Sequence, residues 1–336
     1  MGTTNKVAFI TGISGQDGSY LSELLLKKGY EVHGLVRRHS VAKGQDSRLA
    51  HLSDKIITHY GDLLDPSSIK EALHLVKPTE IYNLAAQSQV WVSSKVPVYT
   101  TQVNAIGVLN LLEEVRHIVP DARFYQASSS EMFGSSVDED GYQRETTNMQ
   151  PVSPYGCAKL FGYHIVRHYR RAYNMFASSG VLYNHESSKR GETFVTQKIV
   201  QGALRIKHGL QEKLALGNLY AFRDWSHATD MVRGMWMILQ HNEPDDFVLA
   251  SGETHSIEEF CDIVFTKLGM NYKDYVEIDP KFYRPQELEY LKGDYFKALT
   301  VLGWQPEMSF DDLIKEMIDG NMNVMFPKSC CKELVK

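Results

Sequence analysis

The chain has 336 residues, of which 43% are hydrophobic, so it is long enough to bury a full core and too apolar to be disordered. Its 36 Lys and Arg and 41 Asp and Glu give a formal net charge of -5 without charged blocks, so no basic face is expected and nucleic acid is a poor candidate partner. No transmembrane run and no leader before the first apolar strand is found, which predicts no membrane association and a cytoplasmic location.

The cysteines indicate neither a metal centre nor a disulfide framework. The chain contains four of them: Cys157, Cys261, Cys330 and Cys331. They show no Cys-x-x-Cys spacing and no matching His pair. His185-Glu186 begins like a zinc motif, but Lys189 stands where the second His is required. We therefore predict reduced thiols and no bound metal.

The first half of the chain alternates predicted strands and helices. Short runs of β-branched and aromatic residues predict the strands, and apolar periodicity between start and stop signals predicts the helices. The expected strands cover residues 6–11, 31–36, 56–60, 80–84 and 123–127, and the expected helices cover residues 20–28, 66–76, 103–119 and 154–173. This alternation predicts an α/β fold with a parallel, doubly wound sheet of the Rossmann type.

The second half is less regular. A further strand is expected over residues 177–183, and capping boxes at Ser256 and Ser309 start two later helices. A stretch rich in Met and aromatic residues, 231–237, is expected in the core. The predicted division is a first domain over 1–175, whose sheet continues to about 185 and over 220–250, a smaller interleaved α/β lobe over 186–326, and a tail over 327–336.

A glycine-rich turn, Gly12-Ile-Ser-Gly15-Gln-Asp-Gly18, lies between the first expected strand and its helix. Small residues there let backbone N–H groups and the helix N-terminus approach a pyrophosphate. Three glycines alone are a weak signal, but their position at the first strand-to-helix junction of a βαβ series is typical of dinucleotide binding. We therefore assign these glycines, together with Gln16 and Asp17, to a cofactor site.

The end of the second expected strand indicates which dinucleotide binds. An NAD enzyme carries an acid in this region for the ribose hydroxyls, whereas this chain has Arg37-Arg38. A guanidinium pairs with a 2′-phosphate, so NADP is the expected cofactor, and a solvated basic loop is the alternative. Asp62, after the third strand, is a candidate partner for the adenine amino group, and the small Ala85 and Ala86 leave room for the dinucleotide. The first domain is therefore predicted to bind NADP.

Tyr155 and Lys159 are four residues apart in an expected helix, so their side chains share one face. A cationic amine beside a phenol favours the phenolate, so we expect Lys159 to lower the pKa of Tyr155 and make it a base toward a substrate hydroxyl. A Tyr-x-x-x-Lys motif is frequent by chance and is usually a surface pair. The motif is more informative here because its helix follows the expected strand that ends near Ser129 and Glu131.

Together these motifs resemble the extended short-chain dehydrogenases that modify nucleotide sugars, and among them the GDP-mannose 4,6-dehydratase family. The resemblance covers nearly the whole chain, from residue 11 to residue 304. Further stretches that carry it are residues 83–88, 184–187, 190–196, 223–225 and 283–285. The chain departs from the family at Ser187-Ser188-Lys189, where the family usually has Ser-Pro-Arg.

The resemblance implies roles for individual residues. Those that occupy the positions of the family's catalytic Thr, Glu, Tyr and Lys are Ser129, Glu131, Tyr155 and Lys159. The dTDP-glucose dehydratases have an Asp-Glu pair where Ser130-Glu131 keeps only the Glu. The further residues implied for the cofactor are Leu63, Leu84, Ala85, Ala86, Ser88, Tyr99, Lys159, His185 and Arg190. Those implied for a GDP-sugar are Asn184, Lys198, Arg223, Arg284 and Glu287, with surface charge as the alternative for the two arginines.

The expected reaction is redox-neutral. Tyr155 deprotonates the C4 hydroxyl of GDP-mannose as hydride passes to NADP, and Glu131 removes the C5 proton. Ser129 and Glu131 assist loss of the C6 hydroxyl as water, the hydride returns to C6, and C5 is reprotonated. The expected product is GDP-4-keto-6-deoxymannose. The alternatives are a nucleotide-sugar 4-epimerase or 4-keto reductase, a second reduction of the product to GDP-rhamnose, and a non-catalytic dinucleotide-binding protein. Glu131 argues against the epimerase, and the full catalytic set argues against the non-catalytic protein.

Two expected helices, 103–119 and 155–173, carry wide apolar faces. The apolar residues on the first are Ile106, Leu109, Leu112 and Val115. In the resembled family such helices pair across a twofold axis, which implies a homodimer. A homotetramer with the Arg37-Arg38 loop at the second contact is the alternative.

Overall fold

The computed structural model describes residues 6–37, 48–283 and 286–327. Its strands are β1 (Val7–Thr11), β2 (Glu31–Val36), β3 (Ile56–Tyr60), β4 (Glu80–Asn83), β5 (Arg123–Ser129), β6 (Ala177–Leu182), β7 (Asn184–Glu186), β8 (Leu214–Leu216), β9 (Phe222–Arg223), β10 (Trp225–His227), β11 (Asp246–Leu249), β12 (His255–Ser256) and β13 (Val276–Ile278). Its α-helices are α1 (Gln16–Lys27), α2 (Pro66–Val76), α3 (Val90–Ser93), α4 (Pro97–Thr101), α5 (Gly107–Ile118), α6 (Pro154–Ala172), α7 (Val195–Lys207), α8 (Ala228–Gln240), α9 (Ile257–Lys267) and α10 (Phe310–Met325). Its shorter helical turns are η2 (Ala50–Leu52), η3 (Gln102–Ile106), η4 (Ser130–Met132), η5 (Tyr272–Asp274), η6 (Pro280–Phe282) and η7 (Ala298–Leu302).

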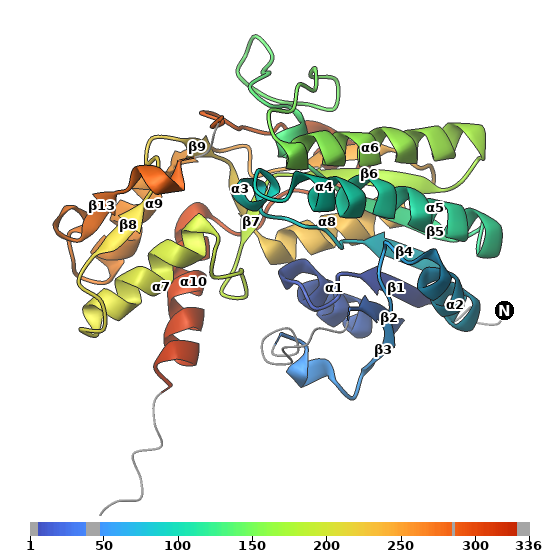
Figure 1. Ribbon diagram of the computed structural model, residues 1–336, viewed down its shortest axis with the longest axis horizontal. Helices are drawn as coiled ribbons and strands as arrows, with labels where there is room; N and C mark the ends of the chain where they lie inside the picture. The colour runs from blue at the N-terminus through green and yellow to red at the C-terminus, as the bar shows by residue number, and fades with distance from the viewer. Residues whose placement is uncertain (1–5, 38–47, 284–285, 328–336) are drawn as a thin grey trace, which may run out of the picture.

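A seven-stranded sheet with the strand order β11-β6-β5-β4-β1-β2-β3 forms the centre of the molecule (Figure 1). All neighbouring strands in it run parallel. The chain moves outwards from β1 to β3 and then returns to β4 on the other side of β1, so the order reverses between β1 and β4. This arrangement confirms the predicted Rossmann-type fold. In such sheets the ligand crevice lies beyond the carboxyl ends of the strands at the reversal.

Both faces of this sheet are covered by helices, as its hydrophobic pattern requires. Ala8 and Ile10 of β1 point to one face and pack with α1 and α8, whereas Phe9 points to the other and packs with α2, α5 and α6. Successive strand residues face opposite sides, so a strand buried on both sides is a continuous apolar run. In α8, Met231 and Met235 are fully buried, which confirms that this stretch belongs to the core.

Capping residues set the starts of several helices where the sequence predicts them. The carboxylate of Asp65 accepts the N–H of Ser67 at 3.1 Å, and Pro66 occupies the first helical position of α2. Ser256 and Ser309 accept N–H groups at 3.0 and 3.2 Å and cap α9 and α10. The predicted capping boxes therefore mark real helix starts.

The helix expected over residues 103–119 differs in the structure. The chain is already helical from Pro97 in α4, passes through the π-helical turn η3 and continues as α5 to Ile118. The segment 98–101 is Val-Tyr-Thr-Thr, and β-branched residues are weak helix formers. Its contact with α6 stabilises a helix that propensity alone does not predict.

The apolar residues expected on the outer face of that helix are largely internal. Leu112 and Val115 are fully buried beside Ile69 and Leu73 of α2 in the core of the chain itself. The expectation that these two residues face a second chain is therefore wrong. Ile106, in η3, is 43% exposed and does face outwards.

The C-terminal lobe has its own core. Helices α7, α9 and α10 pack around residues such as Ile199, Phe260 and Ile314, beside the short parallel pair β8 and β13. Figure 1 shows these elements at the end of the molecule away from β1 to β3. The limits 1–175, 186–326 and 327–336 stay a prediction. None of the helices in the described ranges combines the length and apolarity that crossing a bilayer requires.

Candidate active site

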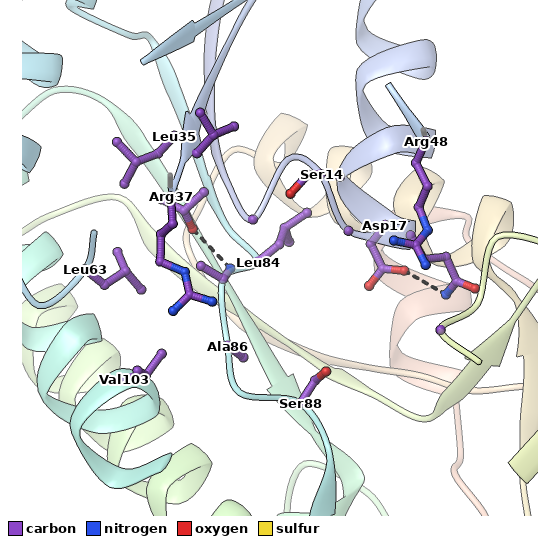
Figure 2. Close-up of a pocket in the computed structure, with 18 of the residues that line it drawn as sticks. Ser14, Asp17, Leu35, Arg37, Arg48, Leu63, Leu84, Ala86, Ser88 and Val103 are labelled. Carbon is purple, nitrogen blue, oxygen red and sulfur yellow. Dashed lines mark hydrogen bonds between the residues drawn. The ribbon is translucent and has the colours of Figure 1, made fainter. Parts of the chain in front are cut away.

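A cavity of about 330 Å³ opens where the carboxyl ends of β1, β2 and β4 meet, at the reversal of the strand order (Figure 2). Many residues predicted for the cofactor line it: Gly12, Gly15, Gln16, Asp17, Gly18, Arg37, Asp62, Leu63, Leu84, Ala85, Ala86, Ser88 and Arg190. The structure therefore brings together predicted residues from five separate stretches of the sequence. Their role in binding stays a prediction.

The glycine turn brings the start of α1 to this cavity. Gly12 has a φ of +70°, and a Cβ there would lie 2.8 Å from the backbone nitrogen of Ala85, so only glycine fits. The carbonyl of Gly12 accepts the N–H of Gly15 at 2.9 Å and closes the turn. In the described part of the chain, no side chain caps α1 at Gly15. Its first N–H groups are therefore suited to an anionic ligand.

Arg37, at the end of β2, lies at one side of the cavity. It donates to the hydroxyl of Tyr99, and its Nη1 lies 3.9 Å from Oδ2 of Asp62. Tyr99 does not line the cavity itself. The structure therefore brings three predicted residues from separate stretches of the sequence together at one place. Arg38 lies outside the described residues.

His185 does not line the cavity, but it orients a residue that does. Its Nε2 lies 2.8 Å from Oδ2 of Asp17, and its Nδ1 lies 2.7 Å from the carbonyl of Tyr183. Because both neighbours are acceptors, both ring nitrogens donate in the charged form. Burial disfavours that form, but the Asp17 carboxylate outweighs it and raises the pKa of His185. Burial raises the pKa of Asp17, but the charge of His185 and the hydrogen bond with it lower this pKa by more, to about 2.

The four predicted catalytic residues meet where β5 ends and α6 begins. Ser129 is the last residue of β5, Glu131 lies in η4, and Tyr155 and Lys159 lie in the first turns of α6. All four side chains are buried. The Oγ of Ser129 accepts the N–H of Glu131 at 3.3 Å. This arrangement places a hydroxyl, a carboxylate and a phenol together at the carboxyl end of β5.

The pKa of Tyr155 differs from the expectation. Burial raises it to about 12; a hydrogen bond with Ser129 lowers it in part, and the charge of Glu131 raises it further. The Nζ of Lys159 is 5.7 Å from the centre of the Tyr155 ring and donates to the carbonyl of Ala127 at 2.9 Å. Burial lowers the pKa of Lys159 to about 8. The expectation of a lowered pKa for Tyr155 is therefore wrong in this structure, because desolvation of the phenolate dominates.

Two residues predicted for the GDP-sugar contact each other. Arg223 is buried and forms an ion pair of 2.8 Å with Glu287, and it also donates to the carbonyl of Leu288 at 2.7 Å. The alternative of a surface charge at Arg223 is therefore wrong. Arg284 lies outside the described residues.

The other two residues predicted for the GDP-sugar lie on different elements. Lys198, in α7, donates to the carbonyl of Ala215 at 2.6 Å, and its Nζ lies 3.5 Å from the centre of the Phe282 ring. Burial and the charge of Lys281 lower the pKa of Lys198. Asn184 is partly exposed in β7, directly before His185. Lys198 and Asn184 therefore stay candidates from separate parts of the lobe.

Several residues that line the cavity were not predicted: Thr11, Ser14, Leu35, Val36, Arg48, Gly61, Val103, Gly191 and Phe194. Those at or next to the ends of β1, β2 and β3 follow the rule that ligands bind at the carboxyl ends of parallel strands. Gly191 and Phe194 belong to the stretch 190–196 that carries the family resemblance. Arg48 belongs to no motif, and nothing in its sequence neighbourhood marks it.

The described residues include two of the four cysteines. Cys157 is exposed, Cys261 is buried, and both are free thiols. Across residues 6–37, 48–283 and 286–327, no three His, Cys, Asp or Glu side chains come together as metal ligands. Cys330 and Cys331 lie outside the described residues.

The fold is shared with solved nucleotide-sugar enzymes. A UDP-glucose 4-epimerase of Thermus thermophilus, solved in complex with NAD, is 26% identical with a TM-score of 0.82, over 94% of this chain and 98% of that one. A dTDP-glucose 4,6-dehydratase of Bacillus anthracis, solved in complex with NAD, is 21% identical with a TM-score of 0.82, over 94% of this chain and 96% of that one. The second likeness concerns the fold alone.

Comparison of sequences is more specific. The family model described as GDP-mannose 4,6 dehydratase matches residues 9–317. GDP-mannose 4,6 dehydratase 2 of Arabidopsis thaliana is 50% identical over an alignment of 329 positions, and the match covers 95% of this chain and 87% of that protein. The human GDP-mannose 4,6 dehydratase is 45% identical over an alignment of 350 positions, gaps included, and the match covers 97% of this chain and 94% of that protein. The chain therefore belongs to the GDP-mannose 4,6-dehydratase family.

Proposed function

We propose that this enzyme, a hydro-lyase, converts GDP-mannose to GDP-4-keto-6-deoxymannose with NADP as its bound cofactor. The observation that supports this best is the meeting of Ser129, Glu131 and Tyr155 at the end of β5. A dehydration needs both a group for the C4 hydroxyl and a base for C5, and this group of side chains contains both. The relatives in Arabidopsis and in humans are named for the same reaction.

The cavity at the glycine turn fits a dinucleotide with a 2′-phosphate. The uncapped start of α1 suits a pyrophosphate, and Arg37 stands after β2 where an NAD enzyme has an acid. Structural neighbours are described in complex with NAD and, in a Pseudomonas aeruginosa protein named RMD, with NADPH, so the fold accepts both. The bound dinucleotide supplies a hydride acceptor that later returns the hydride. Arg37 is the reason to propose NADP.

The side chains of this chain would handle the protons. Tyr155 would accept the proton of the C4 hydroxyl as the phenolate, the form that its hydrogen bond with Ser129 favours and that its burial disfavours. Glu131 takes the proton from C5, which the C4 ketone makes acidic, and Ser129 and Glu131 assist the departure of the C6 hydroxyl as water. Lys159 is largely charged at neutral pH and is held by the Ala127 carbonyl, so it can orient the cofactor ribose. The burial of these groups keeps bulk water from the keto intermediate.

A 4-epimerase or a 4-keto reductase on the same scaffold would also use Tyr155 and Lys159. Glu131 discriminates between them, because neither reaction needs a base at C5. A second reduction of the product to GDP-rhamnose would need external NADPH as reductant, and no residue singled out in this chain indicates it.

An isotope experiment tests the proposal. Purified protein is incubated with GDP-mannose carrying deuterium at C4, and the product is analysed by mass spectrometry and NMR. We expect loss of water and transfer of the deuterium to the C6 methyl group. UDP-glucose and dTDP-glucose serve as controls for the nucleotide. Deuterium lost to solvent, or an epimerised product that keeps all its oxygens, would contradict the proposal.

We also propose that the enzyme is a homodimer. The residues that support this are exposed apolar side chains on α4, η3 and α6: Val98 at 69%, Ile106 at 43% and Phe161 at 40%. Analytical ultracentrifugation tests this proposal, and a protein that sediments as a monomer would contradict it. The substitution Phe161→Glu is expected to dissociate the dimer into monomers. A homotetramer with the Arg37-Arg38 loop at the second contact, and a cytoplasmic location, stay predictions from the sequence.

A further inference from the structure

Arg48 lines the cavity but has no role in the function proposed above. Figure 2 shows it with Asp17 on one side of the glycine turn and Arg37 on the other. The Nε of Arg48 donates to the carbonyl of Lys189 at 2.7 Å, and its own carbonyl accepts from the hydroxyl of Ser19 in α1 at 2.8 Å. Both its backbone and its side chain are therefore held beside the first turns of α1.

The guanidinium of Arg48 still has donors to offer. It carries five N–H groups, and only the one on Nε is used by Lys189. Among the residues that the structure describes, none forms a hydrogen bond or an ion pair with its terminal nitrogens. Burial and then the charge of Arg190 lower the pKa of Arg48, and Glu192 acts in the opposite sense. Two guanidinium groups that share a cavity in this way favour an anion between them.

We propose that Arg48 binds the pyrophosphate of the dinucleotide, together with the N-terminus of α1. This inference rests on the proposed function, because it presumes that a dinucleotide occupies the cavity. The location supports the pyrophosphate, since Arg48 is anchored to Ser19 in α1, and the pyrophosphate of a Rossmann fold lies at the start of that helix. Arg37 follows β2, and in Rossmann folds the residues after this strand contact the 2′ substituent of the adenosine ribose. The two arginines thus divide the phosphates of the cofactor between them.

The loop that holds Arg48 is itself fixed at two points. Lys189 forms an ion pair of 2.6 Å with Glu23 of α1. The N–H and the hydroxyl of Ser188 donate to the carboxylate of Glu316 in α10 at 2.9 and 2.6 Å. A proline at position 188, as in the family's usual Ser-Pro-Arg, has no N–H and no hydroxyl for this contact. The departure from the family pattern therefore creates a link from the lobe to the loop that positions Arg48.

Comparing the affinities for NADPH and NADH distinguishes a contact with the pyrophosphate from a contact with the 2′-phosphate. Both cofactors contain the pyrophosphate, but only NADPH contains the 2′-phosphate. Dissociation constants for NADPH and NADH are measured by fluorescence titration of the purified full-length protein and its variants. We expect Arg48→Gln to weaken both cofactors by the same factor, about 10 to 100-fold, which is typical of a lost charge-assisted hydrogen bond in a phosphate site. Arg37→Gln is expected to weaken NADPH alone. Arg171→Gln, an exposed arginine in α6, is the control for the change in net charge.

The outcomes are distinct. A loss of NADPH affinity alone in Arg48→Gln would assign Arg48 to the 2′-phosphate and overturn the proposal, as would unchanged affinity for both cofactors. Weaker binding of GDP-mannose with unchanged cofactor binding would assign it to the diphosphate of the substrate and also overturn it. Arg48→Lys keeps the charge, should fold even if the Gln variant does not, and is expected to lose less affinity, equally for both cofactors. A wild-type protein that binds neither cofactor would overturn the proposed function, and this inference with it.

Discussion

The large sheet and the smaller lobe hold their charged groups in different ways. On the sheet side, Arg37 and Arg48 face a cavity beside an uncapped helix start. In the lobe, Arg223 is buried against Glu287, and Lys198 is held by a carbonyl and an aromatic ring. A buried charge with protein partners contributes to stability as well as to binding, whereas partly exposed charges that line a cavity contribute mainly to binding. Substitutions on the sheet should therefore impair function with little loss of stability, and substitutions in the lobe should impair both.

The largest effect is expected on the sheet side at Glu131. Glu131→Gln keeps the size of the side chain but removes the base, so dehydration of GDP-mannose should slow by roughly 10²- to 10⁴-fold, the usual contribution of a general base. Its melting temperature and its NADPH affinity should stay close to wild type. Glu139→Gln, an exposed acid in the following loop, is the control. A Glu131→Gln variant that dehydrates at the wild-type rate would remove Glu131 from the mechanism.

In the lobe, Arg223→Ala should reduce stability and binding together. It removes the guanidinium from the Glu287 carboxylate and from two backbone carbonyls, so the free energy of unfolding should fall by about 3 kcal/mol. Urea denaturation measures this change, and GDP-mannose titration measures the affinity. Arg37→Gln, on the sheet side, should change the unfolding free energy by less than about 0.5 kcal/mol. If Arg223→Ala and Arg37→Gln have the same free energy of unfolding, the proposed difference between the lobe and the sheet side is wrong.

Lys159 is an informative exception on the sheet side, because its buried amine destabilises the fold. Its pKa is about 8 in the folded chain against an ordinary value of 10.5, so the unfolded chain binds more protons between these pH values. Stability should therefore rise as pH increases from 8 to 10.5. Lys159→Met should lack this rise, be more stable at pH 7 by roughly 2 kcal/mol, and be inactive. Urea denaturation at pH 7, 8 and 10 tests this, and parallel pH curves for both proteins would contradict it.

The smallest effect is expected where the two regions meet. Glu316 belongs to the lobe but holds Ser188 of the loop that carries Arg48. Glu316→Gln keeps one acceptor for this loop, so NADPH affinity should fall only about threefold, which corresponds to a weakened hydrogen bond. The rate at saturating cofactor should not change. Asp319→Asn, exposed on the same helix, is the control and should bind NADPH as wild type does.

Much of the sheet side could be predicted from the sequence because its signals are local. The bounds of β2, β3 and α2 match the expected residues, and the caps and the glycine turn stand where their residue types indicate. The helix α4 was not predicted, because packing against α6, rather than helix propensity, stabilises it. The four residues predicted to be catalytic do lie together at the end of β5, but the direction of the Tyr155 pKa was predicted wrongly, because spacing along a helix says nothing about burial.

The sequence by itself determined the fold class, the family and the stretches that form the candidate site, since strand periodicity, capping residues and motifs act over a few neighbouring residues. Only the tertiary structure decided which charged groups meet. Asp17 and His185 are 168 positions apart, and Arg48 and Lys189 are 141 positions apart. Contacts at such separations, and the desolvation that shifts each pKa, arise only when distant segments pack together, so no local pattern specifies them.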